Sequence, residues 1–305
     1  MPISIGIGAS PSFINSGGGA APSSPNFIST WDTTQAGSAS DTIVLPMTAG
    51  NTVHWGDGSS DTTNTHTYAS GGVYTVTIEG AVTTFIFNNG GDKAKITDVS
   101  NWGSFEISNA EIFKGCSNLD ISATDYPIIS TTSLFQTFRN CSSLTTPDFS
   151  GWDVSSVTNM QAMFQNATSF NGDITTWDVS GVISGNQFRE MFLGASSFNQ
   201  PIGSWNMSNA TNVSRMLNNA DAFDQDISAW DINQVSNFDS FMQNATGLST
   251  ANYDALLIGW DSQGAMSYSG TVNFGGSQYT SGGAAEAART SLIAKWGGIT
   301  DGGAA

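Results

Sequence analysis

The sequence predicts an α+β repeat protein, in which an N-terminal β-sandwich is followed by a solenoid of strand–helix units of about 25 residues and by a C-terminal helical cap. Three observations support this fold class. A tryptophan-centred segment recurs every 25 to 30 residues, two candidate strands joined by a tight turn precede it, and an amphipathic stretch follows it. Repeats of this length stack into solenoids because a single copy cannot bury its own apolar face.

Residues 1–26 are rich in glycine, serine and proline, and they begin with Ile3, Ile5 and Ile7 at alternate positions. The segment has no lysine or arginine and no continuous apolar run. It therefore fits neither a secretory signal peptide nor a membrane span. We expect an anchoring arm whose isoleucines add a strand to a sheet of another chain.

Residues 27–90 are predicted to form the sandwich. A strand ending at Trp55 leads into a Gly-Asp-Gly turn, and a later strand alternates Tyr74, Val76 and Ile78. The segment W-G-D-G-S…H-T-Y-A-x-x-G-x-Y-T-V-T resembles the PKD domain. That resemblance covers about residues 27–88 and implies an immunoglobulin-like sandwich of the kind found in extracellular and virion proteins.

Residues 91–260 are predicted to form the solenoid. An apolar stripe such as Val157, Met160 and Phe164 favours a short helix in each coil. Two residues after each large apolar residue stands glycine or asparagine, which adopt positive φ at low cost and end helices. We therefore expect a helix that ends at this column and a short strand near each tryptophan. The column comprises Gly115, Asn140, Asn166, Gly194, Asn219 and Asn244.

The tryptophan and phenylalanine columns are expected to form the solenoid core. A row of exposed indoles, one in every coil, would promote aggregation, so burial is favoured. The alternative is an exposed row of indoles that stacks on sugar rings. The core candidates are Trp152, Trp177, Trp205, Trp230, Phe164 and Phe192.

The stretch W-D-V-S-x-V-T-N-M-x-x-M-F-x-N-A-x-x-F-N, which begins at Trp152, resembles the BspA-like leucine-rich repeat surface proteins, found among bacterial surface proteins and phage virion proteins. The resemblance covers about residues 103–260. It implies a leucine-rich-repeat-like solenoid used for adhesion or assembly, and it brings no catalytic residues. The sequence departs from this pattern at Asn206, where the usual acid is missing.

Residues 261–305 are expected to cap the last coil. The stretch 283–296 reads as an amphipathic helix, with Ala288, Leu292 and Trp296 on one face. A second short helix is expected over residues 253–260 and a strand over residues 272–274.

Aspartates recur beside the tryptophans, and Asp153, Asp178 and Asp231 directly follow theirs. Such residues satisfy backbone N–H groups in turns, a role that Asn206 also fits. Stacked carboxylates offer two alternatives, a weak calcium site at these three aspartates and a glycosidase pair that includes Asp173 or Asp178. We expect turn residues, no catalytic residue and no cofactor, with Ca²⁺ as the alternative.

The histidines and cysteines offer little chemistry to the array. His54 and His66 both lie in the predicted sandwich, so the array contains no histidine-based triad or metal site. Cys116 and Cys141 occupy one column in adjacent coils. Because disulfide geometry is demanding, we expect buried free thiols, with a disulfide as the alternative.

The charge balance limits the partners. The net charge is −17, with only 8 lysines and arginines in 305 residues. Phosphate backbones and anionic membranes are bound by basic clusters, so nucleic acid and membrane insertion are not expected.

These features predict a non-enzymatic structural or adhesion protein. We expect a bacteriophage virion component, either a capsid decoration or a fibre or tail protein, present as a homo-oligomer or in many copies. The arm would bind other virion proteins, and the solenoid would bind a host surface glycan or protein. The alternatives are a cell-surface or secreted adhesin, which calls for an export signal, and a polysaccharide-degrading tail protein, which calls for clustered acids in a cleft.

Overall fold

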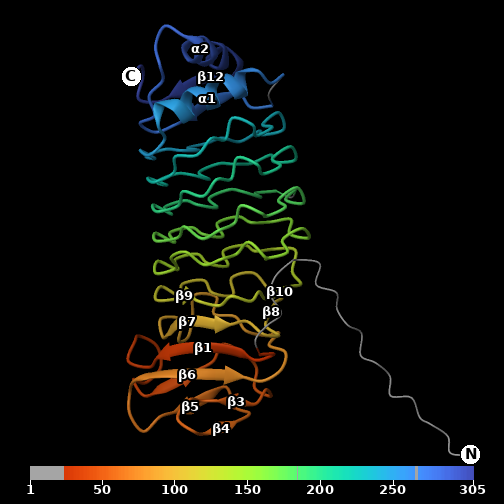
Figure 1. Ribbon diagram of the computed structural model, residues 1–305, viewed down its shortest axis with the longest axis vertical. Helices are drawn as coiled ribbons and strands as arrows, with labels where there is room; N and C mark the ends of the chain where they lie inside the picture. Colours follow the sequence, from red (N-terminus) through yellow and green to blue (C-terminus); the bar gives the residue numbers. More distant parts are fainter. Residues whose placement is uncertain (1–23, 184, 265–266) are drawn as a thin grey trace, which may run out of the picture.

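The computed structural model describes residues 24–183, 185–264 and 267–305, and over these residues the chain forms a rod (Figure 1). Small β-sheets lie at one end of the rod, stacked coils fill its length, and two helices lie at the other end. The expected anchoring residues Ile3, Ile5 and Ile7 lie outside the described residues.

The N-terminal part packs two small sheets against each other. Buried side chains from both sheets, including Trp31, Ile43, Trp55 and Val76, form its core. One sheet contains β1 (Phe27–Asp32), β3 (Val53–His54), β4 (Ser60–Asp61) and β6 (Val73–Ile78), and the other pairs β2 (Thr42–Val44) with β5 (Thr65–Thr67).

The larger sheet continues directly into the coils. Its strand order is β4-β3-β6-β1-β7-β9, where β7 (Ile96–Asn101) pairs antiparallel with β1 and β9 (Asp120–Ile121) pairs parallel with β7. Beside it, β8 (Glu106–Ile107) pairs in parallel with β10 (Ile128–Ile129). The N-terminal unit therefore closes the first coil by sharing a sheet with it, and no polar edge is left open between them.

The predicted strand–helix repeat is wrong. In the described part of the chain the only α-helices are α1 (Thr250–Asp261) and α2 (Ala284–Trp296), both at the C-terminal end. The expected helical segments are instead ribbons of consecutive turns. In one coil the N–H groups of Met163, Gln165 and Ala167 each donate to the carbonyl three residues earlier.

Backbone torsions explain why these segments are not helical. Asn166 has the positive φ expected from its column, but Ala162, four residues earlier, also has a positive φ of 55°. A positive φ at the third position of a turn is typical of type II turns and interrupts an α-helix. The same pair of left-handed residues recurs in every coil of the array, for example at Glu190 and Gly194.

The spacing between coils also excludes helices. Phe138 and Phe164, which occupy one column, have ring centroids 5.7 Å apart, and Phe164 and Phe192 are also 5.7 Å apart. A helix with its side chains is about 10 Å across, so coils built from helices could not stack this closely. The solenoid is therefore a β-type stack of turns, and the short strands expected beside the tryptophans reduce to isolated bridges such as that between Asp148 and Asp173.

Peptide groups in the ribbons join neighbouring coils. An N–H group of one coil donates a hydrogen bond to a carbonyl of the next coil. The N–H of that same peptide group then donates to a carbonyl of the coil after it, so the bonds all point in one direction. One such chain runs the length of the stack, through Phe87 to Ile112, Phe113 to Thr137, Phe138 to Met163, Phe164 to Met191, Phe192 to Met216, Leu217 to Phe241, Met242 to Asn273 and Phe274 to Thr300.

The C-terminal end combines the expected helices with further rungs of the stack. The helices expected over 253–260 and 283–296 are present as α1 and α2. Between and after them, β11 (Gly270–Asn273) pairs in parallel with β12 (Gly297–Thr300). The stack thus extends from Val82, which bridges to Phe105, to these last strands.

Candidate binding groove

The tryptophan column lies in the interior. Trp152, Trp177, Trp205 and Trp230 are between 1% and 4% exposed, so they offer no platform for sugar stacking. In this column, each indole N–H from Trp177 to Trp260 donates to a carbonyl of the preceding coil. The pairs are Trp177 with Phe149 at 2.9 Å, Trp205 with Ile174 at 3.3 Å, Trp230 with Ile202 at 3.0 Å and Trp260 with Ile227 at 3.1 Å.

The aspartates that follow the tryptophans serve as turn residues. The Asp153 carboxylate accepts bonds from the N–H and hydroxyl of Ser155, at 3.1 and 2.6 Å. Asp178 accepts from the N–H of Ser180 at 3.0 Å, and hydrogen bonding from the Ser180 side chain, together with this N–H, holds the pKa of the Asp178 carboxyl below its usual range. Asp231 accepts from the N–H of Asn233 at 3.1 Å.

The second aspartate column has the same role. Asp173 accepts from the N–H and hydroxyl of Thr175, and Asp148 accepts from the N–H of Ser150. Across residues 24–183, 185–264 and 267–305, no three acids, histidines or cysteines gather in a way that could hold a metal ion.

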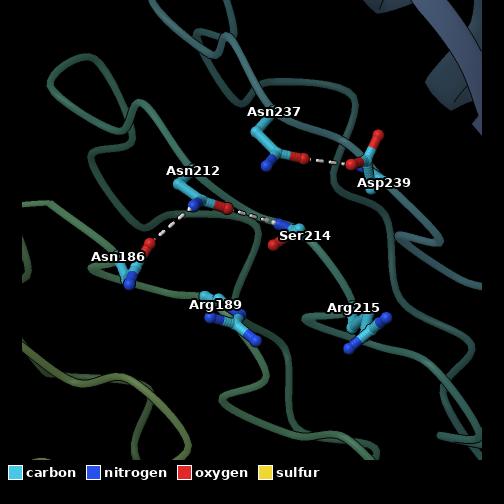
Figure 2. A pocket seen from close by; sticks show the side chains of 7 residues that line it. All are labelled: Asn186, Arg189, Asn212, Ser214, Arg215, Asn237 and Asp239. Carbon is cyan, nitrogen blue, oxygen red and sulfur yellow. Dashed lines mark hydrogen bonds between the residues drawn. The ribbon is translucent and has the colours of Figure 1, made fainter.

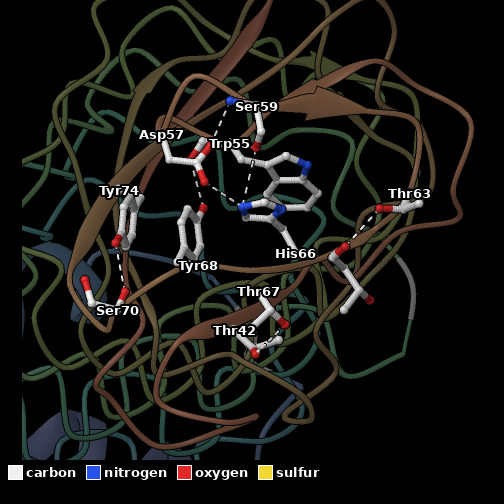
Figure 3. A network of polar contacts seen from close by, with 11 residues as sticks. Thr42, Trp55, Asp57, Ser59, Thr63, His66, Thr67, Tyr68, Ser70 and Tyr74 are labelled. Carbon is white, nitrogen blue, oxygen red and sulfur yellow. Dashed lines mark hydrogen bonds and ion pairs between the residues drawn. The ribbon is translucent and has the colours of Figure 1, made fainter.

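Both histidines lie in the N-terminal sheets, and His66 belongs to a network of polar contacts there (Figure 3). His66 Nε2 lies 2.8 Å from Asp57 Oδ2 and 3.5 Å from Ser59 Oγ, and its ring stacks on Trp55. The Ser59 hydroxyl donates to Asp57 at 2.6 Å, so it is oriented towards the acid and is not activated by the imidazole. His54 contacts Glu79 at 2.8 Å on the exposed side of the sheet.

Cys116 and Cys141 are free and fully buried. The Cys141 thiol donates to the Phe113 carbonyl at 3.1 Å. Burial raises the pKa of both thiols well above their ordinary value, which disfavours the reactive thiolate.

A polar groove lies on the ribbon side of the stack, across three neighbouring coils (Figure 2). It encloses a space of about 180 Å³. Every lining side chain is polar or charged. They are Asn186, Arg189, Asn212, Ser214, Arg215, Asn237 and Asp239.

Asparagines form one edge of the groove. Asn212 Nδ2 donates to Asn186 Oδ1 at 3.1 Å, while Asn212 Oδ1 accepts from the N–H of Ser214 at 3.0 Å. Asn237, one coil further on, accepts from the N–H of Asp239 at 2.9 Å. These contacts orient the side-chain amides of Asn186, Asn212 and Asn237.

Two arginines form the other edge. Arg189 and Arg215 share one acceptor, Glu190 Oε1, at 2.8 and 3.3 Å. The Glu190 side chain is 12% exposed, whereas those of Arg189 and Arg215 are 37% and 52% exposed. Because each guanidinium carries five N–H donors, sharing one carboxylate oxygen leaves most of these donors available.

The groove lies where the repeat is interrupted. Val157 precedes Phe164 by seven residues, whereas Val182 precedes Phe192 by ten, so three residues are added just before Asn186. At the corresponding position, Asn159, Asn212 and Asn237 each close the turn that begins the ribbon of their coil.

In the interrupted coil the corresponding residue is Gln187. Its longer side chain reaches the next coil, where Oε1 accepts from the N–H and hydroxyl of Thr211 at 3.0 and 3.1 Å. Gln187 is fully buried and its Nε2 has no hydrogen-bond partner within the described chain. The Asn186 side chain then takes the place beside Asn212 at the rim of the groove.

The groove is not among the sites predicted from the sequence. Two signals were available, namely the 28-residue interval between Trp177 and Trp205, and the presence of only three basic residues between positions 132 and 256. Two of those three, Arg189 and Arg215, line the groove. Their convergence depends on the register of the stack, which the spacing alone does not give.

Comparisons with known proteins match the repeat region. A family model described as "Mycoplasma protein of unknown function, DUF285" matches residues 84–188 and 132–256, which together span more than half of the chain. The matched segments include the groove and leave out residues 27–83, where the PKD resemblance was expected. No significant match was found among the curated proteins or the solved structures. Within the described residues, no helix is long and apolar enough to cross a membrane.

Proposed function

This chain belongs to the DUF285 family, and we propose that it is a non-enzymatic surface protein that displays a rigid rod for adhesion. The observation that carries this proposal is the division of labour within each coil. The aromatic side chains are buried in the core, and the aspartate carboxylates accept hydrogen bonds within turns. The side chains left over form a repeated polar face.

This division argues against a hydrolase. A retaining or inverting glycosidase needs two carboxyl groups facing a substrate cleft, one of them with a raised pKa. Asp148 and Asp178 instead have a lowered pKa, caused by hydrogen bonds from the serine two residues on. A lowered pKa means that the hydrogen bonds stabilise the ionised carboxylate. An ionised carboxylate can accept hydrogen bonds in a turn, but it has no proton to donate as a general acid.

The family favours a cell-surface location. The narrower placement as a virion component is supported only by the sequence resemblance and by the alternation of Ile3, Ile5 and Ile7 in the arm. If the arm adds a strand to a partner, Ile5→Lys should abolish co-purification with that partner and leave the melting temperature of the rod unchanged. Unchanged co-purification would exclude this mode of anchoring.

The adhesive function can be tested with the purified full-length protein on an array of immobilised glycans and extracellular proteins. We expect saturable binding to at least one surface and no release of reducing ends from any glycan. Asp173→Asn keeps the turn acceptor but removes the charge, so it should bind like the wild type. Release of reducing ends that Asp173→Asn abolishes would establish a hydrolase, and failure to bind any surface would remove the adhesion proposal.

A further inference from the structure

We infer that the groove between the asparagine and arginine edges is a binding site for a carboxylate-bearing sugar of the uronic acid type. This inference rests on the proposed adhesive function and specifies its ligand.

The arginine edge suits a carboxylate. A guanidinium offers paired N–H donors in a fixed plane that match the two oxygens of a carboxylate. Arg189 and Arg215 are held by the largely buried Glu190, which orients both side chains without using most of their donors. Glu190 and Asp239 balance the formal charge of the two arginines, so this edge offers a ligand oriented N–H donors and no net positive charge.

The asparagine edge suits hydroxyl groups. Asn186, Asn212 and Asn237 belong to successive coils, so they present amide groups at the repeat of the stack. Amides both donate and accept hydrogen bonds, as sugar hydroxyls do. The chain of contacts through Asn212 fixes their orientation, which lowers the entropy lost on binding.

The composition of the groove excludes other ligand classes. No aromatic or aliphatic side chain lines it in the described structure, so an apolar ligand or a neutral sugar bound mainly by ring stacking is disfavoured. With a net charge of −17, the protein repels dense polyanions over about 10 Å at 0.1 M salt. A ligand with one carboxylate and several hydroxyls satisfies both limits.

The position of the groove indicates that it is more than a regular feature of the repeat. It coincides with the three added residues and with Gln187, whose buried Nε2 lacks a hydrogen-bond partner within the described chain. A buried polar group without a partner lowers stability. At Gln187 that cost accompanies the placement of the Asn186 side chain at the rim of the groove.

The test is binding of a glucuronate-terminated oligosaccharide to the full-length protein, measured by calorimetry and by chemical-shift changes, with the matching glucose-terminated oligosaccharide as the neutral probe. We expect the glucuronate ligand to bind at least tenfold more tightly. Arg215→Gln should weaken that binding about tenfold, because it removes a charge-assisted contact. Lys114→Gln removes one positive charge from the ribbon of an earlier coil, outside the groove, and should have no effect.

A substitution that removes a negative charge from the groove, where Arg215→Gln removes a positive one, tests the charge of the ligand. Asp239→Asn removes the carboxylate at the end of the groove and should strengthen glucuronate binding severalfold, provided the melting temperature is unchanged. Equal affinity for the two oligosaccharides, weaker binding by Asp239→Asn or wild-type binding by Arg215→Gln would each overturn the assignment. If the wild type still binds a surface on the array while it ignores glucuronate, the adhesive function stands and only this inference fails.

Discussion

At the residue scale, the buried indole N–H groups show how the stack satisfies its polar atoms. From Trp177 to Trp260, the indole N–H of each tryptophan in the column donates to a backbone carbonyl of the preceding coil. The accepting residue stands three positions before the tryptophan of that coil. Trp152 is the first of this column, and its Nε1 has no partner in the described part of the chain. Whether the indole N–H of a tryptophan has a hydrogen-bond acceptor therefore depends on the place of the residue in the stack.

This difference predicts unequal effects of one substitution. Trp177→Phe should lower the free energy of unfolding by about 1 kcal/mol more than Trp152→Phe, because it alone removes a buried hydrogen bond, the one from the indole N–H to the Phe149 carbonyl, which then keeps only the N–H of Trp152 as its donor. Both variants lose similar apolar area, so each controls for the other. Urea unfolding would measure the difference, and equal losses would show that the indole bonds do not contribute to stability.

Asp57 supplies a residue-scale test of pH dependence. Hydrogen bonds from the Ser59 hydroxyl, the Ser59 N–H and His66 lower the pKa of Asp57 to about 2. Since the folded-state pKa lies below the unfolded value, the resulting stability is present above about pH 4 and is lost as the pH falls towards 2.

We expect the Asp57 carboxyl to titrate near pH 2 by NMR in the wild type. Ser59→Ala removes the largest contribution and should move the midpoint towards the ordinary value of about 3.9. Ser70→Ala, at a residue that joins the network only through its backbone carbonyl, should leave the midpoint in place. A wild-type midpoint near 4 would contradict the network drawn in Figure 3.

At the element scale, the ribbon is defined by left-handed residues that are not glycine. Glu190, Arg215 and Ser240 occupy the position two before the large apolar column, with φ between 54° and 60°. The left-handed conformation costs a residue with a Cβ about 1 kcal/mol. The inter-coil hydrogen bonds of the ribbon offset this cost in every coil.

Ser240→Gly tests this account. Glycine adopts positive φ without the steric cost, so the free energy of unfolding should rise by about 0.5–1 kcal/mol. Gln243→Gly, three residues along the same ribbon at a residue without positive φ, should lower it by a similar amount. Thermal unfolding measures both, and a loss of stability in Ser240→Gly would show that position 240 is not left-handed in solution.

The ribbon also explains which parts of the fold the sequence could predict. The repeat period, the apolar columns and the positive φ of residues such as Asn166 follow from local patterns, and the structure has all three. The prediction of a helix in each coil was wrong because the apolar spacing of Val157, Met160 and Phe164 is compatible with both a helical turn and a ribbon of tight turns. The choice depends on hydrogen bonds to the next coil, which no local pattern contains. For the same reason the groove could not be predicted, since Arg189 and Arg215 meet only when the coils are in register.

At the scale of the whole molecule, the rod is a one-dimensional stack closed at both ends. The shared sheet of β1, β7 and β9 closes one end, and α1, α2 and the β11–β12 pair close the other. A stack of this kind gains stability from each coil and from each contact between neighbours. Disturbing one coil should therefore affect its neighbours most.

Phe192→Ala makes this expectation quantitative. The Phe192 ring is fully buried and stacks on Phe164, so its removal should destabilise the surrounding coils by about 3 kcal/mol, or about 100-fold in their opening equilibrium. Hydrogen exchange at the amides of Phe164 and Leu217, which bond to the adjacent coils, should accelerate accordingly. Exchange at Val76 in β6 should stay within a few-fold of the wild type. The control is Ile183→Ala, which truncates a side chain 58% exposed and should change none of the three rates. Equal acceleration at Val76 would mean that the sandwich and the coils open as one cooperative unit, because a break in the middle of the rod would then be transmitted through the shared sheet to its far end.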